Sequence, residues 1–402
     1  MAFNQLNVES KLMILLSKSE LNSEKIIEIE RLCNSLSDWK FFIHQSNNNY
    51  LSQLYTLHFS NKIIANSIPI TIQNECWKVY HKILAENIRF LVAFDEILLN
   101  AKKYNISIIP LKGIFLAEKI YKNQGLRHLS DIDFLVNDHD LEAVRKMMIE
   151  SGWVLSNTPQ TNTYIAKQLL TAHPYTFSKN KIFVEVHNRI HSGGQTFEIN
   201  SKDYISRSIE IKFLKHKIFI LSPTDLLQHT LIHIVKHLFH GHLKIASFCD
   251  VREVIKKHES QIDWQLLLES SEKYNAKKEI ITILLISKAY WNCDIPDLLF
   301  LDFKKDEYYL KAEKRFLNYL NGDYQKLKDL DLQNEPTNLI YLKKQKGILN
   351  KINYLSNDLF PSQDYMRNRY HLSSTFLIFP FYFYRWGLGI RKLFRNLFFK
   401  KS

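Results

Sequence analysis

The sequence predicts a mainly helical α+β fold with a small mixed sheet. The chain has 402 residues, 46% of them hydrophobic and 13% aromatic, which is enough core for two or three domains. Only ten glycines and nine prolines occur, so tight turns are few and helices should dominate. Short β-branched runs gather in the middle of the chain, where the strands are therefore expected.

Helical periodicity brackets this central part. Apolar residues recur every three and four positions up to Lys103, with breaks at 45–50 and 67–69. Proline in "LSPTD" (221–225) suits a helix start and opens a second long helical stretch. The expected regions are helical over 1–100, an α/β core over 101–222, helical over 223–360, and an aromatic and basic tail over 361–402.

The α/β core should alternate strands with helices. "ISIIP" at 106–110 predicts a strand, and "LKGIFLAEKIYKN" at 111–123 predicts a glycine turn and a helix. "DIDFLV" at 131–136 predicts the next strand, and the residues 138–153 predict an amphipathic helix with aspartates as N-caps. Two β-type runs flank the polar residues 178–181 and predict an antiparallel hairpin.

Composition argues against several classes of protein. The four cysteines are widely spaced with no C-x-x-C pair, so neither a disulfide framework nor a zinc knuckle is expected. The N-terminus lacks the basic start and apolar core of a signal peptide, and we expect a cytoplasmic protein. A net charge of +13 suits nucleic acid, but no RNP, KH or zinc-finger pattern accompanies it. Nucleotide phosphates or anionic lipid are equally consistent partners.

Two aspartates stand one residue apart at the start of an apolar run. In a strand, Asp131 and Asp133 point to one face and their apolar neighbours to the other. A divalent metal that holds phosphate oxygens would relieve the repulsion between these carboxylates. The D-x-D pattern also occurs at 138–140 and 329–331, where aspartates suit helix caps or turns. The pattern by itself therefore leaves both interpretations open.

The predicted hairpin supplies a third acid. Alternation puts Glu185 and His187 on one face of their strand. If this strand lies beside the one that carries the aspartates, Asp131, Asp133 and Glu185 converge. Three carboxylates are what two Mg²⁺ or Mn²⁺ ions need when phosphates and water complete their coordination.

The turn before the first core helix suits a phosphate. Gly113 lies at the first turn, where free backbone N–H groups and the helix dipole favour an anion. Lys112 and Arg127 would add positive charge around a triphosphate. The alternative is an ordinary turn glycine beside two solvated cations.

Together these segments resemble the uncharacterised nucleotidyltransferase-like family of bacteria, a branch of the polymerase β-type nucleotidyltransferase superfamily. The resemblance implies a nucleotidyltransferase core in which Asp131 and Asp133 bind metal and Glu185 takes the third-carboxylate position. The superfamily's usual glycine-serine pair is replaced by Lys112-Gly113, so the serine that would contact the γ-phosphate is missing. The likeness rests on "PLKGIFLAEKIY" (110–121), "GLRHLSDIDFLV" (125–136), "VEVHNRI" (184–190), "LSPTDLLQHTLIHIVKHLFH" (221–240), "FCDV" (248–251) and "DW" (38–39).

Histidines mark one face of the helix that follows the core. His229, His233 and His237 recur at i, i+4 and i+8, with His240 and His242 beyond. Two histidines one turn apart can bind zinc, but no H-E-x-x-H pattern is present. Packing of the helical region against the core is the other interpretation. The resemblance adds a third, with His187, His233, His237 and Asp250 on the acceptor side of the cleft.

The C-terminal tail has a membrane-like composition. "TFLIFPFYFY" (375–384) is too short to span a bilayer and is interrupted by Pro380. "RWGLGIRKLFRNLFFKK" (385–401) places apolar residues on one helical face and basic residues largely opposite. The composition suits peripheral contact of 375–400 with an anionic membrane, and docking on the protein itself or on a partner is an equally open interpretation.

The favoured function is metal-dependent transfer of a nucleoside monophosphate from a nucleoside triphosphate such as ATP. The acceptor stays open: a small molecule, a sugar, a protein side chain or a tRNA end. A glycosyltransferase that uses the D-x-D pair is the first alternative, but it would need an N-terminal βαβ unit where helices are predicted. The second alternative is a non-catalytic scaffold with a degenerate transferase fold, tethered to a membrane or a complex.

Overall fold

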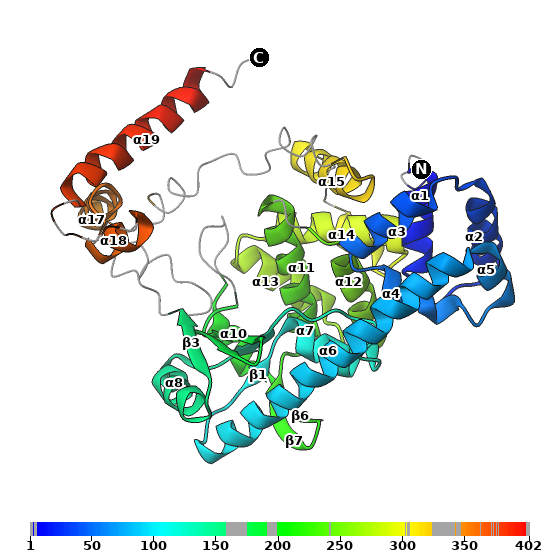
Figure 1. The fold of residues 1–402 in the computed structure, drawn as a ribbon, viewed down its shortest axis with the longest axis horizontal. Helices are drawn as coiled ribbons and strands as arrows, with labels where there is room; N and C mark the ends of the chain where they lie inside the picture. The colour runs from blue at the N-terminus through cyan, green and yellow to red at the C-terminus, as the bar shows by residue number, and fades with distance from the viewer. Residues whose placement is uncertain are drawn as a thin grey trace.

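The computed structural model shows helices packed around one small sheet (Figure 1). The predicted mainly helical α+β fold with a mixed sheet is confirmed. The structure describes residues 3, 6–157, 175–190, 199–240, 243–301, 303, 306–323, 342, 347–361, 363–370, 372, 374, 376 and 378–398.

Short polar residues start several of the N-terminal helices. The Asn7 side chain accepts a hydrogen bond from the Ser10 N–H at 2.8 Å, and Asp38 accepts one from the Phe41 N–H at 2.8 Å. The helices therefore begin and end close to the predicted breaks. Their bounds are α1 Val8–Leu16, α2 Ser23–Ser35, α3 Trp39–Asn48, α4 Ser52–Tyr55, α5 Lys62–Ser67 and α6 Ile70–Lys103.

The long helix α6 connects the N-terminal helices to the core. Its 34 residues span about 50 Å. It packs against α4 near one end and against α8 (Leu141–Glu150) near the other (Figure 1). Phe94, on its buried face, lies 6.5 Å from the ring of Phe134 in the sheet and 5.8 Å from that of Phe213. This packing fixes the back of the sheet.

The sheet has the strand order β1-β2-β5-β4-β3. Strands β2 and β5 are parallel, whereas the other neighbouring pairs are antiparallel. The mixed sheet therefore places two strands side by side whose carboxyl ends point the same way. A separate antiparallel ribbon follows the sheet. The strands are β1 Ile109–Pro110, β2 Ile132–Leu135, β3 Val154–Asn157, β4 Tyr175–Lys179, β5 Ile182–His187, β6 Ile209–Phe213 and β7 His216–Ile220.

The predicted hairpin is the pair β4 and β5. Its two-residue turn, Asn180 and Lys181, has φ values of 52° and 64°. Positive φ at both positions is the turn geometry that matches the twist of paired strands. Val184 and Val186 are fully buried, so Glu185 and His187 lie on the opposite face of β5.

The segment after β1 differs from its prediction. The expected helix over 111–123 is a short α7 (Lys112–Phe115) followed by a π-helical turn (Leu116–Tyr121). The aspartates of 138–140 do not cap α8, because no side chain there bonds the first turn and Asp138 instead accepts a hydrogen bond from Asn188. The D-x-D at 329–331 lies outside the described residues.

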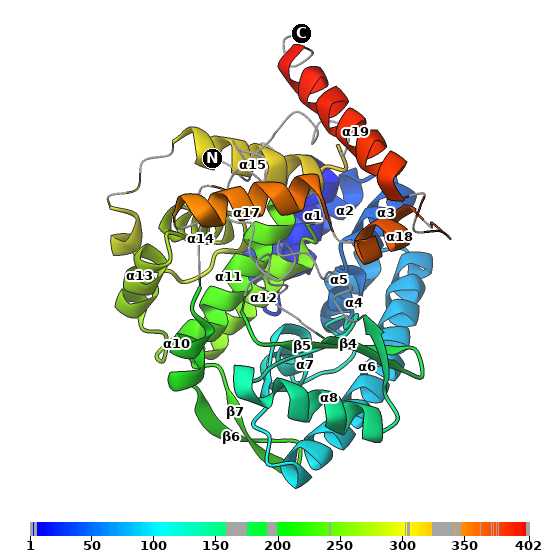
Figure 2. The same cartoon turned by 90° about the vertical axis from the view of Figure 1, so that its left-hand side faces the viewer.

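The C-terminal helices form a second apolar layer. The ring of Phe248 stacks on Trp291 at 5.1 Å, and α11 packs against α12, α13 and α14. Figure 2 shows α11 and α12 beside α7, and α12 contacts the π-helical turn. Among the described residues, no helix combines the length and apolar character that crossing a bilayer requires. The bounds are α10 Ser201–Ser206, α11 Pro223–His240, α12 Ala246–Lys257, α13 Trp264–Lys273, α14 Lys277–Trp291, α15 Glu307–Leu320, α17 Ile348–Leu359, α18 Gln363–Tyr370 and α19 Ile378–Phe398.

Candidate metal and nucleotide site

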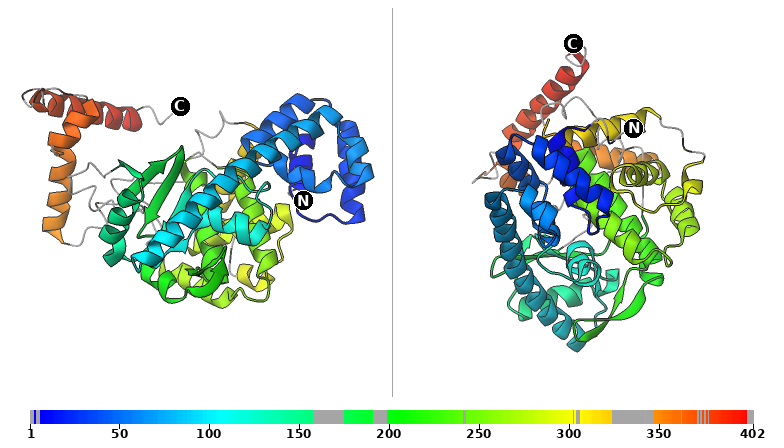
Figure 3. Two further views of the ribbon diagram at one scale, coloured as in Figure 1. Left: turned by 60° about the horizontal axis from the view of Figure 1, so that its bottom comes forward. Right: turned by 90° about the vertical axis from the view of Figure 1, so that its right-hand side faces the viewer.

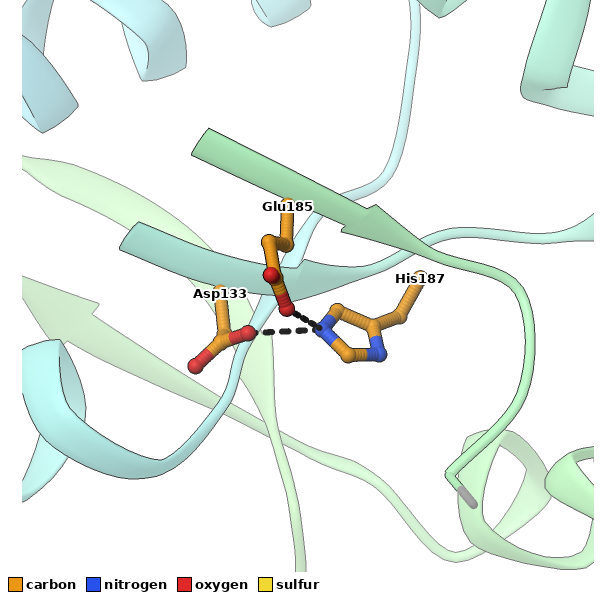
Figure 4. A group of neighbouring side chains, drawn as sticks. All are labelled: Asp133, Glu185 and His187. Atoms are coloured by element: carbon orange, nitrogen blue, oxygen red, sulfur yellow. Dashed lines mark hydrogen bonds and ion pairs between the residues drawn. The ribbon is translucent and has the colours of Figure 1, made fainter. Parts of the chain in front are cut away.

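The register of β2 against β5 builds the centre of the site. Asp133 is opposite Glu185, and Leu135 is opposite His187. Because side chains alternate along parallel neighbours, the two acids point to the same face. Ligand atoms of Asp133, Glu185 and His187 all lie within 4.8 Å of one another, and Figure 4 shows the three side chains converging.

Asp133 is held between two cations. His187 Nε2 lies 2.7 Å from Asp133 Oδ1 and 3.6 Å from Glu185 Oε2. Lys112 Nζ lies 3.4 Å from Asp133 Oδ2. Burial works to raise the pKa of Asp133, but Lys112 and His187 hold that pKa well below its usual range. Asp133 is therefore charged at neutral pH.

The pKa values of His187 and Lys112 are shifted upward, in the opposite direction to that of Asp133. Burial works to lower the pKa of His187, but its bonds to Asp133 and Glu185 raise it above the usual value. Burial also works against the Lys112 ammonium, and the three surrounding carboxylates raise its pKa. The carboxylates thus favour the protonated forms of both groups, and His187 Nε2 can bind a metal only without its proton.

Asp131 lies just before β2 and outside the group of three. Its carboxylate accepts a hydrogen bond from Ser130 Oγ at 2.9 Å. Burial, followed by the nearby charge of Asp133, raises the pKa of Asp131 to about 6, although Lys112 opposes the shift. The charges of Asp133 and Glu185 therefore act on this carboxylate. Among the described residues, no cation lies at ion-pair distance from it.

Gly113 and Arg127 pack against each other. A Cβ at Gly113 would lie 2.6 Å from Arg127 Nη1 and 2.8 Å from Leu129 Cδ2, so only glycine fits without movement. The preceding residue, Lys112, adopts a φ of 43°, which is uncommon for a residue with a side chain. The structure gives Gly113 a packing role; contact with a phosphate stays a prediction.

Arg127 forms an ion pair with a residue of helix α12. Its Nη2 lies 3.1 Å from Asp250 Oδ2 on α12, and its Nη1 donates to the His128 carbonyl oxygen at 2.9 Å. Tyr121 Oη donates to Asp250 Oδ1 at 2.9 Å. The two residues predicted for triphosphate and acceptor binding, Arg127 and Asp250, therefore form an ion pair with each other in this structure.

Helix α11 contributes a histidine pair. His233 Nε2 and His237 Nε2 lie 3.0 Å apart. Burial lowers the pKa of His233 well below its usual value, with Lys112 and His237 adding to the effect. The described residues contain no group of three possible metal ligands on this helix; the His240 side chain and His242 lie outside the described part.

Lys236 is a site residue that the sequence reasoning missed. Burial and then the charge of Lys112 lower the pKa of Lys236, whereas the charges of Glu185 and Asp133 raise it, so its charge interacts with those of the acidic group. Its position, i+3 from His233 on α11, could have revealed that it shares the face of that histidine. Two lysines on different elements therefore interact electrostatically with the carboxylates.

The donor set suits a divalent cation. Carboxylate oxygens bind Mg²⁺ and Mn²⁺, and an imidazole nitrogen is a common ligand of transition ions. Asp133, Glu185 and His187 would hold the ion, with Asp131 beside it. A divalent cation held by these carboxylates could also bind the oxygens of phosphate groups.

Comparison with known proteins finds a matching family. A family described as uncharacterised nucleotidyltransferases matches residues 35–292, which include the whole sheet and the helices α11 and α12. No curated protein matches the chain. Since the match covers more than half of the sequence, the chain belongs to this family of uncharacterised nucleotidyltransferases.

Proposed function

We propose that the protein transfers a nucleoside monophosphate from a nucleoside triphosphate to an acceptor hydroxyl or phosphate, with a divalent metal as cofactor. One observation carries the proposal. In a chain of a nucleotidyltransferase family, two parallel strands bring Asp133, Glu185 and His187 within 4.8 Å of one another. A fold has no need of such a group, and phosphoryl transfer does.

The metal would be Mg²⁺ or Mn²⁺, and two ions fit the proposal when Asp131 joins Asp133 and Glu185. When bound, such ions stabilise the charge on the transferred phosphoryl group and on the departing pyrophosphate. Mn²⁺ is the better fit if neutral His187 acts as a ligand. Mg²⁺ is the better fit if His187 stays protonated on Asp133.

The chain's own residues have distinct roles in this proposal. Glu185, the most exposed of the three clustered side chains at 27%, accepts the proton of the acceptor hydroxyl. The acceptor oxygen bonds to the α-phosphorus while the bond to pyrophosphate breaks. Lys112 and Lys236 offset the negative charge of the triphosphate, a task to which a serine usually contributes in the superfamily.

The test is release of pyrophosphate by the purified chain with mixed nucleoside triphosphates, a cell extract as acceptor source, and Mg²⁺ or Mn²⁺. Asp133→Asn should lower the rate by about 100-fold or more. The matched control is Asp140→Asn in the second D-x-D, which should keep full activity. Calorimetric titration of Mn²⁺ should show weakened binding in Asp133→Asn alone. Full activity of that variant would remove the proposal, and mass spectrometry of the products identifies the acceptor.

A second candidate is the non-catalytic scaffold. It is favoured by one observation, that Lys112 and His187 already neutralise Asp133 inside the protein. A thermal-shift screen separates the two, because a scaffold of this kind would show no stabilisation by any nucleoside triphosphate with Mg²⁺ or Mn²⁺. The glycosyltransferase alternative loses support, since no strand precedes Ile109 among the described residues.

The proposed location is the cytoplasm. A cytoplasmic protein would meet ATP and the other nucleoside triphosphates at high concentration. A small molecule, a sugar or a protein side chain is the proposed acceptor, because no nucleic-acid recognition motif occurs in the sequence.

A further inference from the structure

The last described helices form a unit that points away from the rest of the molecule. Figures 1 and 3 both show α19 and α17 outside the layer formed by α11–α14. Within the unit, the ring of Phe360 lies 5.0 Å from Trp386, and Trp386 Nε1 donates to the Leu359 carbonyl oxygen at 2.8 Å. Tyr370 of α18 lies 5.0 Å from Phe381. These contacts join the three helices.

The packing leaves several aromatic side chains of α19 exposed. Tyr382 and Trp386 face α17 and the residues that follow it. Phe379 and Phe383, one turn apart, are 64% and 67% exposed. An aromatic stripe of this kind is unusual on a surface in contact only with water.

Helix α17 adds a second exposed stripe. Ile348, Ile352, Leu355 and Leu359 recur at i, i+4, i+7 and i+11, and they are between 45% and 77% exposed. This is the spacing of one helical face. The helix therefore presents apolar side chains to the outside.

Charge distinguishes the end of the chain from everything before it. The residues 365–402 contain eight lysines and arginines and neither aspartate nor glutamate. They thus carry more than half of the net charge of +13 in less than a tenth of the sequence. An acidic surface is the complement of this segment.

We infer that α17 and α19 bind the surface of an anionic lipid bilayer. The exposed aromatic and aliphatic stripes would enter the boundary between headgroups and acyl chains, while the basic side chains contact anionic headgroups. Tryptophan and tyrosine are enriched at this depth of a membrane, and α19 contains both. Nucleic acid would satisfy the charge but not the apolar stripes. The inference goes beyond the proposed function and does not depend on it.

The test uses co-sedimentation of the full-length protein with vesicles. We expect binding to vesicles of phosphatidylcholine with about 30% phosphatidylglycerol and weaker binding to vesicles of pure phosphatidylcholine. Phe379→Gln/Phe383→Gln/Leu388→Gln should weaken the binding by about tenfold or more, because it removes exposed apolar area and leaves the charge unchanged. Raising the salt concentration should also weaken it.

The matched control changes three equally exposed apolar residues of α6, Ile88→Gln/Val92→Gln/Leu99→Gln. This variant should bind the anionic vesicles as the wild-type protein does. Equal binding by both triple variants, or no binding to either kind of vesicle, would overturn the inference. So would retention on RNA that exceeds retention on anionic vesicles. Circular dichroism confirms that each variant has kept its helices.

Discussion

Two clusters of charged side chains beside the sheet differ in how their charges are paired. Arg127 and Asp250 form a closed pair in which each charge has its counter-charge 3.1 Å away and further bonds from Tyr121 and to His128. At the β2 and β5 face, carboxylates instead lie close to one another. The Arg127–Asp250 pair therefore stabilises the fold, whereas the clustered carboxylates are unfavourable and must be stabilised by the rest of the fold.

The cost of the second cluster is visible in Asp131. Its carboxyl group has a pKa of about 6, because burial and the charge of Asp133 disfavour its ionised form. A residue kept for stability alone would be neutralised or replaced. Like charges gathered in a buried position are typical of a site that binds a cation.

The largest expected effect concerns the closed pair. Asp250→Asn leaves the Arg127 guanidinium buried without its counter-charge, and it should lower the free energy of unfolding by about 3 kcal/mol. Urea unfolding at pH 7 measures this. The control is Asp297→Asn, which removes the exposed partner of Lys288 and should change stability by less than about 1 kcal/mol. Equal effects of the two variants would contradict a structural role for the pair.

Next comes the close contact at Gly113. Gly113→Ala forces the added methyl group against Arg127 and Leu129 and should destabilise the protein by about 2 kcal/mol. Combined with Asp250→Asn, the two effects should be less than additive, because both release Arg127. Gly387→Ala in α19 is the control, since open space surrounds that position and alanine favours a helix. A fully additive double variant would argue against the shared contact.

Asp131→Asn should change stability in the opposite direction. Because the folded-state pKa of about 6 exceeds the unfolded value of 3.8, the wild-type protein loses stability as pH rises from about 4 to about 6. The asparagine variant lacks this loss and should be more stable at pH 7 by about 1 to 2 kcal/mol, after allowance for solvent screening. Thermal unfolding at pH 4 and pH 7 checks the sign. If the variant were instead less stable than the wild-type protein at pH 7, the Asp131 carboxylate would be stabilising, as the Arg127–Asp250 pair is.

The smallest effect is expected at Lys236. Lys236→Met removes a cation whose charge interacts with those of the carboxylates, and it should raise KM for the nucleoside triphosphate by about tenfold with a smaller change in kcat. Steady-state kinetics with the pyrophosphate assay measure both constants. Lys217→Met, on the exposed ribbon, should change neither. An unchanged KM for Lys236→Met would exclude Lys236 from triphosphate binding.

The sequence could predict whatever depends on near neighbours. Alternation placed Glu185 and His187 on one face of a strand, and the polar turn between the hairpin strands was identified from its own residues. The ribbon of β6 and β7 was open to the same reasoning, because "IEIKF" and "HKIFI" alternate, but it was not identified. The expected caps at 138–140 failed, since Asp138 has a partner 50 residues away.

What the sequence by itself determined is the set of chemical groups: helices with their breaks, a hairpin, and acids on the polar faces of two short strands. Only the tertiary structure decided which of these groups meet. It set Asp133 opposite Glu185 and paired Arg127 with Asp250, 123 residues away in the sequence. It also brought the charge of Lys236 within range of the carboxylates. The physical reason is one of range. Periodicity and turn geometry act over a few residues, whereas charges respond to whatever the packed core places within a few ångströms.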